Sequence, residues 1–221
     1  MYAPSITEQK NVINVYRDIS GHFSDTRNSV WDGVKQFLEK QDMNSSGFEI
    51  GCGNGKNMHY AEELGHSITG IDTCIQFIRE CNKNRLKAHI GNAVDQTYTD
   101  NSFDYCISIA VFHHLSTNEA RTKAFMNMID IIRPGGKGLI TVWAAEQDGF
   151  SNKKFKAGDN IVKWHKPYDI DNKRHYEIYD RYYYVYTEDM FKCYIKEFEN
   201  IKIDIIYNQK GNWFCEFTKI K

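Results

Sequence analysis

The sequence has no pair of cysteines at C-x-x-C spacing and no grouping of cysteines and histidines at the spacing of metal ligands. Such spacing is typical of zinc sites, and disulfide frameworks belong to small secreted domains. The cysteines are scattered instead, at Cys52, Cys74, Cys81, Cys106, Cys193 and Cys215. We therefore expect reduced thiols, no structural metal and an intracellular protein.

Long apolar runs and a charge excess are also missing. No stretch approaches the roughly 20 apolar residues that span a bilayer, and the N-terminus lacks the charged-then-apolar pattern of a secretory signal. These absences predict a soluble protein of the cytoplasm, with the nucleus as a second location. The formal net charge of −1 excludes a strongly basic body that grips nucleic acid alone. A positive surface for RNA must then be local or come from a partner.

What is present is an alternation of helix and strand patterns, without internal repeats, over one domain of 221 residues. A helical face at Val30, Val34, Phe37 and Leu38 precedes a strand at 47–50. Further strands are predicted at 67–72, 88–90, 103–111 and 138–143, with a helix near 75–82. Strands that alternate with helices indicate a parallel sheet and an α/β, Rossmann-like fold.

Several signals place the remaining elements. The run Ser116-Thr-Asn-Glu119 is a capping-box pattern that begins a helix, and Pro134-Gly-Gly136 ends it. After a helix around 191–198, the segments 201–207 and 213–218 read as strands joined by a turn at 208–212. The prediction is a mostly parallel seven-stranded sheet whose last strand is antiparallel.

Between about 146 and 180 the periodic pattern fades into lysine, aspartate, glycine and aromatic residues, and it returns at Arg181. We interpret this segment as a substrate-side insertion or mobile lid within a single domain spanning 1–221. Its positive charge either meets RNA phosphates or belongs to a solvated loop. The cations concerned are Lys153, Lys154, Lys156, Lys163, Lys166, Lys173 and Arg174.

A glycine cluster lies between the first predicted strand and a helix, where glycines allow a tight turn and close approach of a ligand. It reads G-x-G-x-G, and Lys56 occupies the position of the last glycine in a dinucleotide fingerprint. This form is similar to the loop that binds S-adenosylmethionine, with Glu49 as the preceding acid. Asp72 ends the next strand, where an acid takes ribose hydroxyls. The alternative is an ordinary strand–helix turn, with Asp72 as a helix cap.

Several more specific motifs lie along the chain: His22-Phe-Ser-Asp-Thr-Arg27 with Trp31, Gly51-Cys-Gly-Asn-Gly-Lys56, Ser108-Ile-Ala-Val-Phe-His-His114, Trp143-Ala-Ala-Glu-Gln147, Arg181-Tyr-Tyr and Asn212-Trp213. Together they resemble the eukaryotic tRNA wobble-uridine methyltransferases that esterify 5-carboxymethyluridine, including the methyltransferase part of the animal AlkB-type wobble hydroxylase. The resemblance extends from about Val15 to the C-terminus.

The chain also departs from the family pattern. Asp32 and Lys163 stand where the family has prolines, and Asn92 stands where an aspartate meets the cofactor adenine. An asparagine can still accept a hydrogen bond through its side-chain oxygen. The resemblance implies S-adenosylmethionine as cofactor, bound by Glu49, Gly51, Cys52, Gly53, Asn54, Gly55, Asp72, Asn92, Ala93 and Ala110.

The implied reaction makes a methyl ester from a carboxylate, which is ionised at neutral pH because its pKa is near ~4. No general base is needed, and catalysis should rest on proximity and orientation. Arginine is the natural clamp for a carboxylate. Arg27 and Arg181 are the candidates, and a phosphate anchor or a structural ion pair is the alternative for each.

Other side chains are candidates for holding the substrate. His113 and His114 follow the fourth strand at the ligand-binding edge; one is expected to face the substrate and the other to be structural. A splayed uridine would stack on aromatic rings, although tyrosines at strand spacing are often plain sheet residues. His113 is placed with the catalytic arginines, and the substrate-binding candidates are His114, Trp143, Trp164, Tyr182, Asn212 and Trp213, with Tyr183 as a further stacking residue.

The resemblance also implies partners: the anticodon loop of tRNA, and a small zinc-binding activator subunit that would form a heterodimer with this chain. Two other functions stay open at this level. The chain could methylate a small carboxylate or amine, or it could be a non-catalytic module that keeps the fold and binds RNA or a partner. The intact glycine loop and Asp72 favour a working cofactor site.

Overall fold

The computed structural model of the protein describes residues 2–95, 98–147, 149 and 154–221. Its centre is a seven-stranded sheet in the order β3-β2-β1-β4-β5-β9-β8. β1 (Ser46–Ile50), β2 (Ser67–Asp72), β3 (Lys87–Ile90), β4 (Phe103–Ile109) and β5 (Ile132–Trp143) are parallel. β9 (Asn212–Lys219) runs antiparallel to both β5 and β8 (Ile201–Gln209). The predicted sheet, with its antiparallel last strand, is confirmed.

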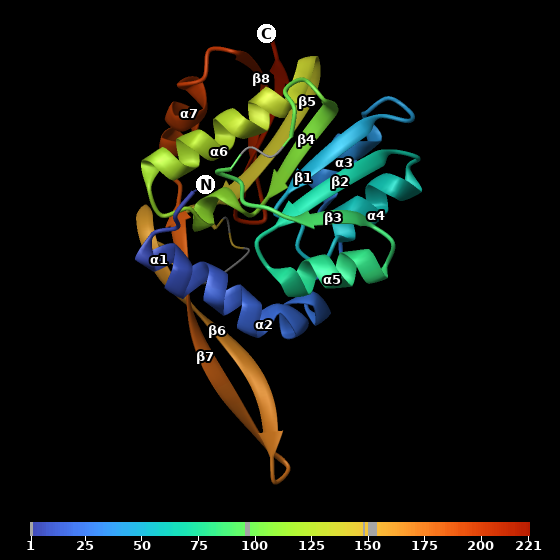
Figure 1. Ribbon diagram of the computed structural model, residues 1–221. Helices are drawn as coiled ribbons and strands as arrows, with labels where there is room; N and C mark the ends of the chain where they lie inside the picture. The colour runs from blue at the N-terminus through green and yellow to red at the C-terminus, as the bar shows by residue number, and fades with distance from the viewer. Residues whose placement is uncertain (1, 96–97, 148, 150–153) are drawn as a thin grey trace.

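Helices cover both faces of this sheet (Figure 1). α3 (Asp32–Glu39), α4 (Lys56–Glu63) and α5 (Ile75–Lys83) share one core cluster, and α6 (Asn118–Ile131) and α7 (Glu188–Lys196) share another. Neighbouring residues of β4 point to opposite clusters, since Tyr105 and Ile107 join the first and Cys106 the second. This alternation follows from the two-residue period of a strand. Side chains on both faces of the central parallel strands are therefore buried, as a parallel sheet requires.

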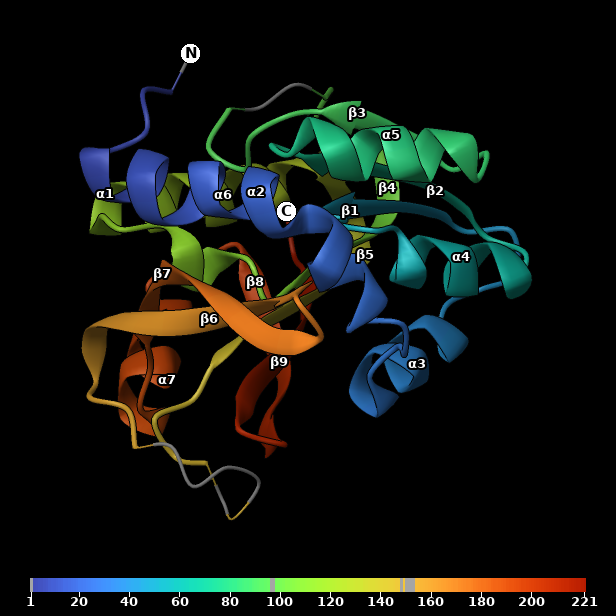
Figure 2. The ribbon, with the colours of Figure 1, turned by 90° about the horizontal axis from the view of Figure 1, so that it is seen from below.

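The N-terminal segment forms helical structure that the sequence analysis did not predict. α1 (Ile6–Glu8), a π-helical stretch (Gln9–Ile13) and α2 (Asn14–Asp25) follow one another and cross below the sheet (Figure 2). Glu8 fixes this segment, because its buried carboxylate accepts from Ser116 N at 2.6 Å and from the Tyr2 hydroxyl at 2.7 Å. A buried carboxylate is stable only when such donors surround it.

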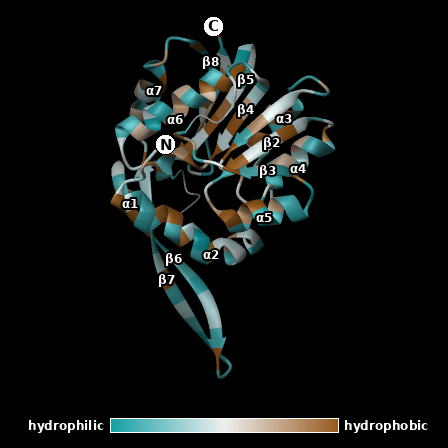
Figure 3. Cartoon of the chain, in the orientation of Figure 1, coloured by the Kyte–Doolittle hydropathy of each residue, from teal (hydrophilic) through white to brown (hydrophobic). Residues whose placement is uncertain are grey.

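The segment predicted as a lid is a β-hairpin from 158 onward. β6 (Gly158–Ile170) pairs with β7 (Lys173–Val185), and the two-residue turn Asp171-Asn172 has φ of 49° and 59°. Such left-handed turns match the twist of paired strands. The hairpin projects from the body, and most of its outer half is hydrophilic (Figures 1 and 3). The periodic pattern faded because the outer strands have no core to face, so Arg181 lies within β7 and does not begin the ordered region.

Several predicted boundaries shift by one or more residues. Thr117, not Ser116, caps α6, since Ser116 is engaged with Glu8. β5 already begins at Ile132, so Pro134 lies inside the strand that follows the helix. β4 ends at Ile109, where Ala110 takes a left-handed φ of 61° and turns the chain. Among the described residues, no helix is both long and apolar enough to span a bilayer.

Two glycines test how tightly this fold is packed. A Cβ on Gly138 of β5 would lie 2.0 Å from Cζ of the buried Phe217, whereas a Cβ on Gly21 of α2 would meet nothing within 4 Å. We expect Gly138→Ala to lower the free energy of unfolding by about 1–3 kcal/mol through overpacking. Gly21→Ala should raise it by about 0.5–1 kcal/mol, because glycine is unfavourable within a helix. Chemical denaturation of the two variants checks both signs, and an unchanged Gly138→Ala midpoint would contradict the packing.

Candidate active site

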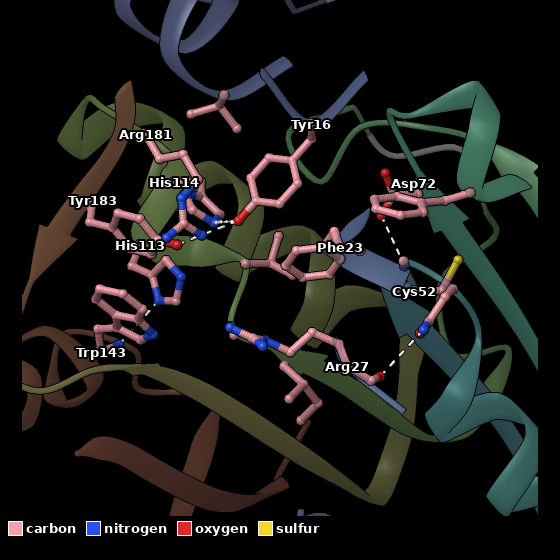
Figure 4. A pocket seen from close by; sticks show the side chains of 18 of the residues that line it. Tyr16, Phe23, Arg27, Cys52, Asp72, His113, His114, Trp143, Arg181 and Tyr183 are labelled. Carbon is pink, nitrogen blue, oxygen red and sulfur yellow. Dashed lines mark hydrogen bonds between the residues drawn. The ribbon is translucent and has the colours of Figure 1, made fainter. Parts of the chain in front are cut away.

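A pocket of about 890 Å³ lies at the carboxyl ends of the parallel strands, between α2, the glycine loop and the base of the β6–β7 hairpin (Figure 4). Open α/β sheets bind ligands at this edge. Most of the predicted site residues line it together. They are Arg27, Glu49, Gly51, Cys52, Gly53, Asn54, Asp72, Asn92, Ala93, Ala110, His113, His114, Trp143, Trp164, Arg181 and Asn212.

The glycine loop joins β1 to α4. Gly51, Gly53 and Gly55 all have positive φ, at 72°, 53° and 78°. A Cβ on Gly53 would meet no atom within 4 Å, so this glycine leaves its backbone open to the pocket. Gly55 was predicted to bind the cofactor, but it does not line the pocket. A Cβ there would lie 2.4 Å from Leu86, so Gly55 serves the packing of α4 against its neighbours.

Asp72 ends β2 beside this loop. One carboxylate oxygen accepts from Gly53 N at 3.0 Å and the other from Cys74 N at 2.8 Å. Burial raises the pKa of Asp72, while these backbone donors lower it. Each oxygen keeps a lone pair that can accept a further hydrogen bond. The carboxylate is therefore fixed at the place where the sequence predicts contact with ribose hydroxyls.

Glu49 lies at the base of the loop and is 1% exposed. Its Oε1 accepts from Asn57 Nδ2 at 2.7 Å, whereas Oε2 is buried without a hydrogen-bond partner. Burial raises its pKa to about 8, although Asn57 and Lys56 oppose the shift. A cation bound near this carboxylate would lower its pKa and would satisfy the unpartnered oxygen.

Residues that follow β3 and β4 complete the half of the pocket that contains the glycine loop. Asn92 Oδ1 accepts from Val94 N at 2.9 Å, which leaves one lone pair and the amide hydrogens available. Ala93 adjoins it, and Asn127 holds the Ala93 carbonyl at 3.0 Å. Ala110 donates to Thr141 Oγ1 at 2.9 Å in its left-handed conformation. A positive φ is unusual for alanine and is often found at functional sites.

His113 and His114 lie on a short 3-10 helix (Phe112–His114) after β4, and both are buried. Trp143 N donates to His113 Nδ1 at 3.1 Å, so in the neutral ring Nε2 carries the proton. His114 Nδ1 donates to the Tyr182 carbonyl at 2.8 Å, so its Nε2 accepts from the Tyr16 hydroxyl at 2.9 Å (Figure 4).

Both histidines are kept neutral. Burial lowers the pKa of His114 to about 3, and the charge of Arg181 adds to the effect. Burial, His114 and Arg181 lower the pKa of His113 well below its ordinary value. Neither ring then carries charge at neutral pH, and cationic charge on this side of the pocket comes from arginine.

Arg181 is 5% exposed and has no ion-pair partner among the described residues. Its guanidinium carbon lies 4.7 Å from the Trp164 ring centre and 5.1 Å from that of Tyr183, and its Nε has no hydrogen-bond partner. Arg27 also lines the pocket but is exposed, 5.5 Å from the Trp164 ring centre. A buried guanidinium without a counter-ion is a ready site for an anion.

Aromatic rings form the rest of the half of the pocket that contains Arg181. Trp143 stacks on Tyr183, with ring centres 3.9 Å apart and planes 16° apart. Trp164 donates from Nε1 to His22 Nδ1 at 3.2 Å and packs on α2. Trp143 is half-buried, so part of its ring stays open to the pocket.

Two predicted substrate-binding residues do not line the pocket. The Tyr182 side chain points the other way, and its hydroxyl donates to Asp159. Alternation along β7 explains this, because Arg181 and Tyr183 face the pocket on either side of it. Trp213 belongs to the core cluster under α6 and α7, and its Nε1 donates to the Tyr186 carbonyl at 3.2 Å.

Tyr16 is a pocket residue that the sequence analysis missed. It lies on α2, and its hydroxyl bonds His114 and lies 3.5 Å from the Tyr183 hydroxyl. Val12, Tyr16, Ile19 and Phe23 recur at helical spacing, and this periodicity could have predicted the helix and its buried face.

Of the lysine and arginine side chains predicted to meet RNA, one lies at the rim of the pocket and others form ion pairs. Lys163 lines the pocket, while Lys166 pairs with Glu177 at 3.8 Å and Arg174 with Asp169 at 2.8 Å. Lys153 lies outside the described residues. Within the part of the chain that is described, no three His, Cys, Asp or Glu side chains are grouped as metal ligands would be.

Comparison with known proteins shows that this chain is similar to methyltransferases. Residues 48–140 match the family described as "Methyltransferase domain". The chain is 30% identical to a Xenopus tropicalis tRNA (carboxymethyluridine(34)-5-O)-methyltransferase over 98% of its own length and 42% of the frog protein. It is 36% identical to the Saccharomyces cerevisiae protein of that name over 72% of its own length and 58% of the yeast protein. The chain thus spans roughly half of these relatives.

Solved structures share the fold. A SAM-dependent methyltransferase from Methanosarcina mazei superposes with a TM-score of 0.66 at 15% identity, over 87% of this chain and 99% of that one. A Burkholderia thailandensis N1-methyltransferase with bound S-adenosylhomocysteine gives 0.67 at 15% identity, over 100% and 94%. A Haloferax volcanii methyltransferase in complex with the Trm112 activator gives 0.66 at 11% identity, over 96% and 99%. The predicted class I methyltransferase fold is confirmed.

The neutral histidines predict how stability depends on pH. The folded protein holds His114 unprotonated, while the unfolded chain binds a proton as pH falls below about 6.5. This contribution to stability is fully present above pH 6.5 and is lost as pH falls toward 3. We expect His114 to account for a loss of about 2 kcal/mol in unfolding free energy between pH 7 and pH 5.

Denaturant titrations of His114→Asn across this range measure that contribution, since asparagine can still donate to the Tyr182 carbonyl. Stability of the variant should fall less steeply with acid than that of the wild type. His59 is exposed on α4, and His59→Asn is the matched control that should keep the wild-type slope. Equal slopes for His114→Asn and the wild type would show that His114 is not held neutral.

Proposed function

Since the chain belongs to the family of tRNA (carboxymethyluridine(34)-5-O)-methyltransferases, we propose that it methylates the carboxylate of 5-carboxymethyluridine at the tRNA wobble position. S-adenosylmethionine donates the methyl group, and the product is the methyl ester. The match to the methyltransferase domain and the geometry of the glycine loop support this donor.

One observation carries the proposal beyond a generic methyltransferase: Arg181 is a buried cation to which the described residues supply no ion-pair partner. Removing an unpaired charge from water costs free energy, and the cost is offset when a counter-ion binds. A carboxylate fits the planar guanidinium in a two-pronged arrangement. The substrate class that the pocket selects is therefore an anion on the side of Trp143 and Tyr183.

The cofactor half of the pocket fits the proposed donor. Gly53 offers backbone without a side chain, Asp72 offers lone pairs for hydroxyls, and the buried Glu49 offers an unpartnered carboxyl oxygen. Burial raises the pKa of Glu49 to about 8, and a cation bound nearby would lower that pKa and favour the carboxylate. When bound, the cofactor supplies an electrophilic methyl group on a positively charged sulfur.

The chain then needs only to hold the two reactants in line. The substrate carboxylate is ionised at neutral pH, and its oxygen would form the bond to the methyl carbon as the bond between that carbon and sulfur breaks, which leaves the electron pair on sulfur in a neutral thioether. Arg181, with Arg27 at the mouth, orients this oxygen. The neutral His113 and His114 do not compete for the carboxylate as cations and shape the wall around it. Water exclusion by the surrounding rings strengthens the ion pair.

A base in an RNA loop must leave its stack to reach such a pocket. The stacked pair of Trp143 and Tyr183 offers an aromatic surface for it. At the rim, Lys163 of β6 adds positive charge. The tRNA anticodon loop is thus the proposed macromolecular substrate.

The proposal extends to a partner and a location. A small zinc-binding activator subunit would pair with this chain as a heterodimer, by resemblance to its family, and the near-neutral net charge leaves room for a partner to supply RNA-binding surface. The fold shared with an activator-bound methyltransferase is compatible with this. The proposed location is the cytoplasm, with the nucleus as a second site.

The experiment is methyl transfer from labelled S-adenosylmethionine to an anticodon stem-loop RNA bearing 5-carboxymethyluridine, with and without the activator, followed by nucleoside analysis. The methyl ester is the expected product. Free 5-carboxymethyluridine and small carboxylic acids serve as the second arm. Methylation of small acids without transfer to RNA would favour a small-molecule enzyme, and cofactor binding without any transfer would favour a non-catalytic module.

Arg181 gives a sharper test of the carboxylate clamp. Arg181→Gln should lower kcat/KM on the carboxymethyl RNA by about 100-fold or more, because charge-assisted bonds to the carboxylate are lost. Arg181→Lys should fall in between, since it keeps the charge without the planar fork. Arg17 is exposed on α2 and pairs with Asp18, so Arg17→Gln is the control that should stay within about twofold. Full activity of Arg181→Gln, with cofactor affinity unchanged, would refute the clamp.

A further inference from the structure

Asn212 occupies a special place in the pocket. It begins β9 and lies directly opposite Trp143 of β5. In the sheet order, the proposed cofactor contacts follow β1, β2, β3 and β4, while Trp143 and Asn212 lie on the far side of β4. Asn212 therefore belongs to the substrate half, next to the ring proposed to receive the base.

The hydrogen-bond state of its amide is unusual. Nδ2 donates one hydrogen to the Lys210 carbonyl at 3.0 Å, whereas Oδ1 is buried without a partner. The residue is 8% exposed and lines the pocket. Buried acceptors are normally satisfied, because leaving one without a donor costs free energy. The unpartnered oxygen points to a donor on a ligand.

The other unpartnered pocket atoms lie on the cofactor side or belong to the proposed carboxylate clamp. Glu49 Oε2 and Asn57 Oδ1 lie together at the glycine loop, on the cofactor side. Arg181 Nε belongs to the guanidinium proposed to hold the carboxylate. Asn212 Oδ1 is the remaining unpartnered pocket acceptor among the described residues, and it is a neutral one on the substrate side.

The backbone under Asn212 is fixed from two directions. Gly33 N donates to Gln209 Oε1 at 3.1 Å, and Lys210 pairs with Asp32 at 3.2 Å. On the other side, Asn208 Nδ2 donates to the Glu146 carbonyl at 3.2 Å. An amide on such a rigid support is preorganised for recognition.

We propose that Asn212 reads the Watson–Crick edge of the target base. Its Oδ1 accepts from the N3–H of the uracil ring, and its second Nδ2 hydrogen donates to an adjacent ring carbonyl. Uracil carries a hydrogen at N3 and cytosine does not, so an acceptor at this point selects uridine. This inference rests on the proposed function, and it concerns base identity, whereas Arg181 concerns the carboxylate.

The test compares two anticodon stem-loops that differ by one methyl group: 5-carboxymethyluridine and its N3-methyl analogue, which lacks the donor. The wild type should prefer the first by about 50-fold or more in kcat/KM, because its buried acceptor would be left unpaired by the second. Asn212→Ala should lose about 10- to 50-fold on the unmethylated substrate. The preference of Asn212→Ala for 5-carboxymethyluridine over the N3-methyl analogue should fall to within about threefold in kcat/KM.

Asn208→Ala is the matched control. Asn208 lies in β8, just before the turn that leads to Asn212, and outside the pocket lining, so its loss loosens the support without removing the proposed contact. Activity of this variant can fall, but its preference between the two substrates should stay as in the wild type. A role of Asn212 in the turn alone would leave the preference of Asn212→Ala unchanged, and that outcome would overturn the inference.

The two proposals fail in different ways. If the wild type transfers no methyl group to either stem-loop, the proposed function is wrong. Equilibrium binding of the two stem-loops by wild type and Asn212→Ala then still tests base reading, because the contact requires no turnover. Equal binding of both stem-loops by the wild type would overturn the inference that Asn212 reads the base.

Discussion

The pocket is organised around a charge that has been taken out of water. Arg181 lies between the rings of Trp164 and Tyr183, and the described residues supply no carboxylate to balance it. Everything nearby accommodates that charge. The two histidines are neutral: His114 bonds the Tyr16 hydroxyl and the Tyr182 carbonyl, and His113 accepts from Trp143 N. Helix α2 closes the apolar side with Trp164. Leaving a cation uncompensated in such a place costs free energy, and a bound anion would offset that cost.

The sheet topology separates two tasks. Strands on one side of β4 present glycine backbone and carboxylates, which suit a cationic sulfur compound with ribose hydroxyls. Strands on the other side present aromatic rings, a guanidinium and an amide. Because all parallel strands end at the same edge, the two groups face each other across the loop that carries Ala110. The proposed methyl donor and the proposed acceptor carboxylate would then approach each other across this loop.

The sequence was informative wherever a residue type is demanded by backbone geometry or by a core. The glycine loop, Asp72 and the mostly parallel sheet with its antiparallel last strand follow from such local rules, and the structure agrees with the prediction. Tyr182 and Trp213 were misplaced because an aromatic residue in a strand gives no sign of which face it takes until the neighbouring strands are known. The hairpin was missed because its outer half buries little, so hydrophobic periodicity had nothing to record. Tyr16 needed knowledge of α2, which lies far from His114 in the chain.

The base of the hairpin is joined to the N-terminal helical segment at several points. Asn11 donates to the Asp180 carbonyl, Lys166 donates to the Asp18 carbonyl, and Trp164 bonds to His22. The same segment carries Tyr16 into contact with His114. The hairpin is therefore not a module that could be exchanged alone. A graft would have to carry residues 11–23 along with it, or these contacts and the wall of the pocket that they support would be lost.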